Sequence, residues 1–222
     1  MSNVVTETKV RLSFCNLLVP RAQDSQKPDD KTYSSAVLIP KSDTATVEAI
    51  KAAINEALED GVVKTWGGNR PAQLRNPLRD GDEKYLKDGV TKDPTYAGMW
   101  FINAKGPYGG KSQPVLLGPN GQQTDSAAVI YSGVFGQVKL NFFAYDKAGN
   151  RGIGAGIASF LSSGQGDALS SVETADSARA DFGVADTSPA SEFATGNAAT
   201  AAAEGASTSA SAPAEAAKDV WT

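Results

Sequence analysis

Residues 137 to 145 read QVKLNFFAY, and their side chains alternate between two kinds of surface. Successive side chains on a β-strand point to opposite faces, which separates these residues into two sets. One set is apolar and consists of Val138, Leu140, Phe142 and Ala144. The other consists of Gln137, Lys139, Asn141, Phe143 and Tyr145. The run therefore predicts a strand with one face in the core and an unusual aromatic and polar face outside it.

The same alternation can be followed back towards residue 128. The apolar face gains Val134 and Ile130. The outer face then contains the rings of Tyr131, Phe135, Phe143 and Tyr145, here called the aromatic stripe. A β-bulge at Gly133 or Gly136 would reverse the alternation at that point, so the run itself is the firmer part of the pattern.

Composition limits the class of protein. Of the 222 residues, 41% are hydrophobic and 21% are charged, as in soluble globular proteins. The sequence contains no run of about 18 or more apolar residues, so no membrane span is expected. Residues 1–10 lack the basic and then apolar order of a secretory signal. The single cysteine, Cys15, fits a reducing compartment and a packing role, and we expect a cytoplasmic protein.

Histidine is absent, which removes His-based triads, His general bases and the usual His-containing metal sites. Asp80, Asp82 and Glu83 cluster in the segment RDGDEK, but the spacing does not match an EF-hand loop. A solvated turn is the favoured interpretation of these carboxylates. We expect no metal, no cofactor and no catalytic activity, although paired carboxylates acting on nucleic acid stay open as a third alternative.

Charge divides the chain into two parts. Residues 1–165 carry 19 Lys and Arg against 16 Asp and Glu, whereas residues 166–222 carry 2 against 9. The second part is rich in Ala and Ser and has too few apolar residues to offset its chain entropy, which predicts a disordered acidic tail. Trp221 beside Asp219 has no packing use in such a tail and is interpreted as a tip that docks to a partner.

The body, residues 1–165, is predicted to be mainly β. Strand patterns cover residues 9–19, 32–39, 96–105, 113–117, 128–146 and 151–161. In the first of these, Val10, Leu12 and Phe14 are expected to share one face, with Lys9, Arg11 and Ser13 on the other. The clear helix runs from a cap at Ser42 or Asp43 to Gly61, and residues 62–94 are expected to be an extended loop region.

About five strands with one main α-helix and long loops fit an OB-fold-like five-stranded antiparallel barrel, a fold that binds oligonucleotides. Two glycine-rich segments add detail. Residues 105–112, KGPYGGKS, miss the phosphate-binding P-loop by one position, and we favour a loop that carries Lys105, Tyr108 and Lys111 to a phosphate backbone. Residues 149–160 lack the third glycine of a dinucleotide-binding motif, so their glycines are expected to permit close strand packing.

Residues two apart on a strand are roughly 6.6 Å apart, about twice the base rise of a duplex. Bases that stack on the aromatic stripe must therefore be unstacked from one another, which suits single strands. Lysines and arginines alongside would neutralise phosphates. The predicted nucleic-acid interface consists of Arg11, Trp100, Lys105, Tyr108, Lys111, Tyr131, Phe135, Lys139, Phe143, Tyr145 and Arg151.

Several blocks carry a resemblance to a known family: residues 34–58, LRDGDEK, YAGMWFINAK, and above all residues 130–157, which contain YSGVFGQVKLNFFAYDKAGNRGIGAGI. They resemble a bacteriophage single-stranded DNA-binding protein family with an OB-fold, long catalogued as a domain of unknown function. The family is similar in plan to the replication proteins of short-tailed phages.

The resemblance implies that the chain coats single-stranded DNA during phage replication, recombination or repair in the infected bacterium. It also implies that the acidic tail competes with DNA for the groove and recruits phage or host replication and recombination proteins. A structural virion β-domain that uses the aromatic stripe as a subunit interface is the alternative. Salt separates the two, because DNA binding weakens steeply with salt and apolar association does not.

On this interpretation, Phe143→Ala should weaken the binding of single-stranded DNA by about 1–3 kcal/mol, the range for one lost base–aromatic stack. The measurement is a titration of labelled oligo-dT with the wild type and the variant. Wild-type affinity in the variant would remove Phe143 from the interface.

Overall fold

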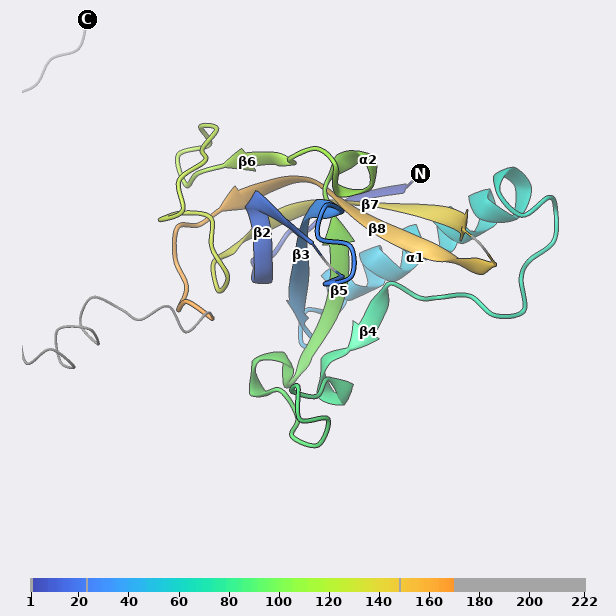
Figure 1. Cartoon of the computed structure of the whole chain (residues 1–222), viewed down its shortest axis with the longest axis horizontal. Coiled ribbons are helices and arrows are strands. Elements are labelled where there is room, and N and C mark those ends of the chain that lie inside the picture. Colours follow the sequence, from blue (N-terminus) through green and yellow to red (C-terminus); the bar gives the residue numbers. More distant parts are fainter. Residues whose placement is uncertain (1, 23, 148, 170–222) are drawn as a thin grey trace, which may run out of the picture. The chain divides into compact units, whose positions relative to one another are not determined.

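The computed structural model describes residues 2–22, 24–147 and 149–169 (Figure 1). The chain divides into two units, Met1–Val172 and Glu173–Thr222, and every described residue belongs to the first. The elements are β1 (Ser2–Val5), β2 (Val10–Ala22), β3 (Lys31–Pro40), α1 (Thr44–Lys64), β4 (Leu78–Asp80), the 3-10 turns Gly81–Glu83 and Pro94–Tyr96, β5 (Met99–Lys105), α2 (Pro107–Gly110), β6 (Val115–Leu117), β7 (Phe135–Lys147) and β8 (Asn150–Ser162). The predicted mainly β fold with one main helix is confirmed.

Five of the strands pair in a closed ring in the order β2, β3, β5, β8, β7 and back to β2. This order supports the OB-like arrangement predicted from the sequence. β1 adds to β7, β4 to β5 and β6 to β8, outside the ring. The expectation of a purely antiparallel ring is wrong at one point, because β5 and β8 pair in parallel through Lys105 and Gly156.

The inside of the ring is the hydrophobic core, and β7 contributes the face predicted for it. Val138, Leu140 and Phe142 are fully buried. The irregularity between β7 and β8 leaves Ala158 of β8 without a partner, so the alternation along β7 is unbroken from Phe135. The predicted strand begins seven residues too early, because residues 128–134 form turns in which Gly133 has a φ of 112°.

The helix α1 begins as predicted and ends later. Asp43 is its N-cap, and the Asp43 carboxylate accepts a hydrogen bond from the backbone N–H of Thr46 at 3.2 Å. Gly61 does not end the helix, which continues to Lys64. A Cβ at Gly61 would lie 2.4 Å from the Cβ of Ala144, so this glycine lets α1 approach β7 closely.

The region 62–94 contains short elements where an extended loop was expected, namely β4 and the first 3-10 turn. Within the described ranges, no helix is long and apolar enough to cross a membrane.

Gly136 pairs with Val10 where β7 closes onto β2, and a Cβ there would lie 2.3 Å from the backbone oxygen of Leu161. Gly136→Ala should therefore lower the free energy of unfolding by about 1–3 kcal/mol through overpacking. Denaturant unfolding of both proteins measures the difference. Gly118→Ala is the matched control, because the closest contact of its Cβ would be a flexible side-chain oxygen at 3.3 Å. An equal effect of the two substitutions would contradict the argument.

Candidate nucleic-acid interface

The outward face of β2, β3 and β5 carries a row of side chains whose order follows from the strand register. Arg11 pairs with Leu38, Leu38 with Phe101, and Phe101 with Arg79 of β4. The neighbouring row, Leu12, Val37 and Ile102, is fully buried inside the ring. Because alternate residues point to opposite faces, the first row lies on the outside. Figure 1 shows these three strands side by side, with β4 beyond β5.

A groove of about 310 Å³ lies on this face. Its lining includes Phe14, Asn16, Ser34, Arg79, Lys84, Tyr96, Phe101, Asn103 and Lys105. Tyr96 and Phe101 are buried and meet edge to face, with ring centroids 5.1 Å apart. The Tyr96 hydroxyl donates to Ser13 Oγ at 3.2 Å, and burial raises its pKa. The groove thus has an aromatic floor fixed by packing and by a hydrogen bond.

Basic side chains surround the groove. Arg79 is exposed, and its guanidinium lies 5.6 Å from the centroid of Phe101. Lys105 is exposed at the end of β5, and Lys84 follows the 3-10 turn after β4. Among the described residues, these three form no ion pair with a carboxylate. Their charges are therefore available to an anionic ligand.

Phe14 also lies on this face, which differs from the prediction made from the strand alternation. It was expected to share a face with Val10 and Leu12, which are buried, but it is 64% exposed and its φ is 48°. The pairing of β2 with β3 is irregular between Ser13 and Asn16, and this bulge turns Phe14 outward while Leu17 stays buried. A left-handed backbone at a phenylalanine costs about 1–3 kcal/mol, and such positions concentrate at functional sites.

The cysteine beside Phe14 faces the other way. Cys15 packs against the core, its backbone N–H donates to Ser132 Oγ at 2.8 Å, and burial raises the pKa of its thiol to about 11. This agrees with the packing role expected for Cys15.

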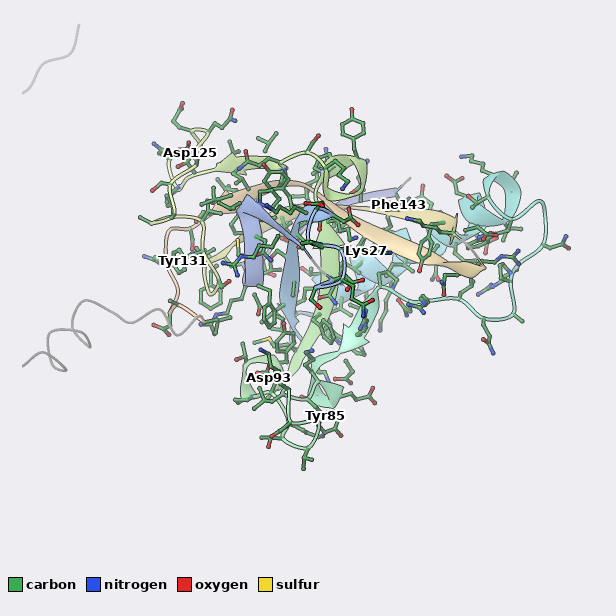
Figure 2. All side chains as sticks on the ribbon, in the orientation of Figure 1. Lys27, Tyr85, Asp93, Asp125, Tyr131 and Phe143 are labelled. Atoms are coloured by element: carbon green, nitrogen blue, oxygen red, sulfur yellow. The ribbon has the colours of Figure 1, made fainter. Side chains whose placement is uncertain are left out.

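The aromatic stripe is not one surface. Phe143 and Tyr145 lie on the β7–β8 hairpin, opposite Gly154 and Gly152. Both rings are half-buried, and a Cβ at Gly154 would lie 2.8 Å from the Phe143 ring, so the glycines of β8 make room for it. Lys139 is exposed on the same face. Figure 2 shows Phe143 well to the right of Tyr131, on another part of the molecule.

Tyr131, Phe135 and Arg11 lie instead beneath residues 163–169. The Tyr131 hydroxyl donates to the carbonyl of Gly166 at 2.7 Å, and the Phe135 backbone N–H donates to Gln165 at 2.8 Å. The Arg11 guanidinium donates to the carbonyl of Asp167 at 2.8 Å and lies 5.2 Å from the centroid of the Phe135 ring. Residues 166–169, which were expected to belong to the tail, thus contact β2 and the turn that precedes β7.

Trp100 points to the face of β5 opposite the groove. It packs against the core, and the ammonium groups of Lys41 and Lys51 lie 5.2 and 5.7 Å from its ring centroid. Lys41 also contacts Asp80 at 2.5 Å and Asp82 at 2.6 Å, and its hydrogen bonds lower the pKa of both carboxyl groups. A lysine therefore compensates part of the charge of the acidic segment, as in a structural turn.

Of the remaining predicted residues, Tyr108 is 86% exposed on α2, beyond Lys105. Lys111 is paired with Asp30 at 2.6 Å, and Arg151 with Asp146 at 2.6 Å. Asp219 and Trp221 lie outside the described residues. The groove therefore brings together Lys105 with Phe14, Arg79 and Lys84, three residues that the sequence analysis did not predict. The bulge at Phe14 contains no glycine, so the pattern of apolar and polar residues gave no indication of it.

Comparisons with known proteins identify a family and solved structures with a similar fold. A family model described as "Enterobacter phage Enc34, ssDNA-binding protein" matches residues 2–193. A protein named "Putative protein p50", from Acyrthosiphon pisum secondary endosymbiont phage 1, is 29% identical over 163 residues, which cover 72% of this chain and 83% of that protein.

Two solved structures share the fold. The single-stranded DNA-binding protein of bacteriophage Enc34 in complex with ssDNA is similar with a TM-score of 0.62 at 20% identity, over 76% of this chain and 90% of that chain. The single-stranded DNA-binding protein gp2.5 of bacteriophage T7 is similar with a TM-score of 0.51 at 12% identity, over 78% of this chain and 97% of that chain.

The raised pKa of the Cys15 thiol predicts that the native protein is alkylated slowly. At pH 8 a thiol of pKa about 11 is about 0.1% ionised, against about a quarter for an unfolded cysteine. Since the thiolate is the nucleophile, iodoacetamide should alkylate the native protein on the order of 100-fold more slowly than the urea-unfolded protein. Mass spectrometry of timed samples measures both rates, with glutathione as the control for the reagent in each buffer. Equal rates would contradict burial of Cys15.

Proposed function

The chain belongs to the single-stranded DNA-binding protein family of Enterobacter phage Enc34, as the resemblance in the sequence indicated, and from this we propose that it binds single-stranded DNA with little sequence preference. The observation that carries the proposal is the groove on β2, β3 and β5, with the exposed ring of Phe14 beside basic side chains that have no carboxylate partner among the described residues.

The place of the groove in the ring supports this function. β3 and β5 are the second and third strands of the ring, and the face of these strands is where OB-folds bind oligonucleotides. Arg79, Lys84 and Lys105 supply positive charge along it for phosphates. Asn16 and Asn103 line the same groove and can donate to or accept from base edges.

The exposed ring favours single strands over duplexes. In a duplex each base is covered by its neighbours, so an aromatic side chain finds no free base face. In a single strand a base can leave the stack and pack on Phe14, and such a contact is tolerant of sequence because every base has a π-face. Phe14 is held outward by the bulge before any ligand arrives, which reduces the entropy lost on binding.

The biological role follows from the class of ligand. We infer that the protein coats and protects single-stranded DNA during phage replication, recombination or repair in the cytoplasm of the infected bacterium. The family is one of binding proteins, and the groove needs no chemistry for this role. The acidic tail with Asp219 and Trp221 would compete for the groove and recruit replication or recombination proteins.

The β7–β8 hairpin is a second surface for the same ligand. Lys139 is exposed there beside the half-buried rings of Phe143 and Tyr145. In an OB-fold the loop between the fourth and fifth strands, here the turn between β7 and β8, helps to bind the strand. The Phe143→Ala titration therefore tests the hairpin, and a substitution at Phe14 tests the groove.

Phe14→Ala should weaken the binding of labelled oligo-dT by about 1–3 kcal/mol, the cost of one lost stack, with the salt dependence nearly unchanged because no charge is removed. Fluorescence anisotropy of the full chain at two salt concentrations, with duplex DNA as competitor, measures the affinity and the strand preference.

The matched control is Val19→Ala, which truncates another exposed apolar side chain of β2, 68% exposed, away from the groove lining. It should bind as the wild type does. Unchanged affinity in Phe14→Ala would exclude Phe14 from the interface. If the wild type did not bind oligo-dT even at low salt, the proposed function would be wrong and a role of this face as a protein interface would be favoured.

A further inference from the structure

Two segments that are distant in the sequence meet near the Lys105 end of the groove. They are the short helix α2 and the chain that runs from the loop between β2 and β3 into the start of β3. The backbone N–H of Gly106 donates to the carbonyl of Tyr33 at 2.9 Å, and a Cβ at Gly110 would lie 2.7 Å from the Cβ of Thr32. These contacts fix α2 against the start of β3. In Figure 2, Lys27 marks the loop between β2 and β3.

One carboxylate faces several lysines at this meeting point. The ammonium group of Lys111 lies 2.6 Å from Asp30 Oδ1. The hydrogen bond and charge of Lys111 lower the pKa of Asp30, and the charges of Lys105 and Lys147 lower it further. Asp30 is thus the acceptor at the centre of positive charge from β5, α2 and β7.

An exposed aromatic ring lies between two of these lysines in the chain. Tyr108 is 86% exposed and has a φ of 53°, in a turn closed by the bond from the Gly110 N–H to the carbonyl of Gly106 at 2.8 Å. A second non-glycine residue in the left-handed region, again an exposed aromatic ring, repeats the feature seen at Phe14. Packing does not explain an outward ring held in this conformation.

We propose that Lys105, Lys111, Lys147 and Tyr108 form a nucleotide subsite, in which a DNA phosphate takes the place that the carboxylate of Asp30 holds in the free protein. This proposal rests on the proposed function. It adds a negatively charged residue, Asp30, which competes with the DNA phosphate for the lysines. The base next to that phosphate stacks on Tyr108.

Replacing the carboxylate of Asp30 by a DNA phosphate at Lys111 costs little free energy. Asp30 and Lys111 are 61% and 58% exposed, and ion pairs at such positions contribute little to stability. A carboxylate and a phosphodiester each carry one negative charge and accept hydrogen bonds from an ammonium group. Asp30 therefore keeps three like charges together when DNA is absent, and it competes with phosphate when DNA is present.

The test is Asp30→Asn, with Asp29→Asn as the matched control. Asp29 is the adjacent exposed residue and forms no ion pair among the described residues, so the same charge is removed one position away. Asp30→Asn should tighten oligo-dT binding by about threefold to tenfold and steepen the dependence of log K on log salt by about 1, because a phosphate contact no longer displaces an internal anion. Asp29→Asn should change affinity by less than about twofold.

A second substitution separates the subsite from a general charge effect. Adding Lys111→Met to Asp30→Asn should abolish the gain and bring the salt slope back towards the wild-type value. An equal gain in Asp29→Asn and Asp30→Asn, or no gain in either, would overturn the subsite while the wild type still binds. Absence of binding in the wild type would instead overturn the proposed function. Thermal unfolding of each variant confirms that the comparison is between folded proteins.

Discussion

The closure of the five-strand ring is the constraint on which the rest of the structure depends. It is made by two short contacts: Val10 and Arg11 of β2 with Gly136 and Phe135 of β7, and Lys105 of β5 with Gly156 of β8. Closure removes the free edges of these strands and gives each of them an inside and an outside. Every inward side chain becomes core, and every outward side chain becomes available for a ligand or for another segment of the chain.

The outside of the ring is divided into surfaces with different roles. The face of β2, β3 and β5 has an aromatic floor and, within the described ranges, arginine and lysine side chains without carboxylate partners. The start of β2 and the turn before β7 are covered in part by residues 163–169, which hydrogen-bond to Arg11 and Tyr131. The β7–β8 hairpin holds Phe143 over Gly154. A strand of alternating residues thus serves several surfaces because it curves around the ring.

Among the described residues, some lysine and arginine side chains are paired with carboxylates of the protein, and others are free to bind an anionic ligand. Lys41 contacts Asp80 and Asp82, and Arg151 contacts Asp146, so these cations compensate carboxylates of the protein itself. Lys111 is also paired, but its partner Asp30 is exposed and lies in the loop between β2 and β3. Since the body carries only three more cations than anions, the cations that lack a partner in the described part of the chain decide where an anionic strand can bind.

Much of the fold could be predicted from the sequence, because local physics decides it. The alternation at 137–145, the Asp43 cap of α1, the glycines of β8 that make room for Phe143, and the charge difference between body and tail are all properties of neighbouring residues. The absence of histidine likewise limits the chemistry open to the chain, because composition does not depend on how the chain folds.

The candidate site depended on the tertiary structure. Phe14 points outward because of a bulge that only the pairing of β2 with β3 reveals. The ring of Trp100 is in contact with Lys41 and Lys51, which reach it from other parts of the chain. Whether a lysine is paired depends on carboxylates far away in the sequence, as with Asp30 and Lys111. The sequence by itself therefore determined which residue types alternate along each regular strand. The folded chain decided which of those side chains meet, because closing a ring sets distances that no local pattern encodes.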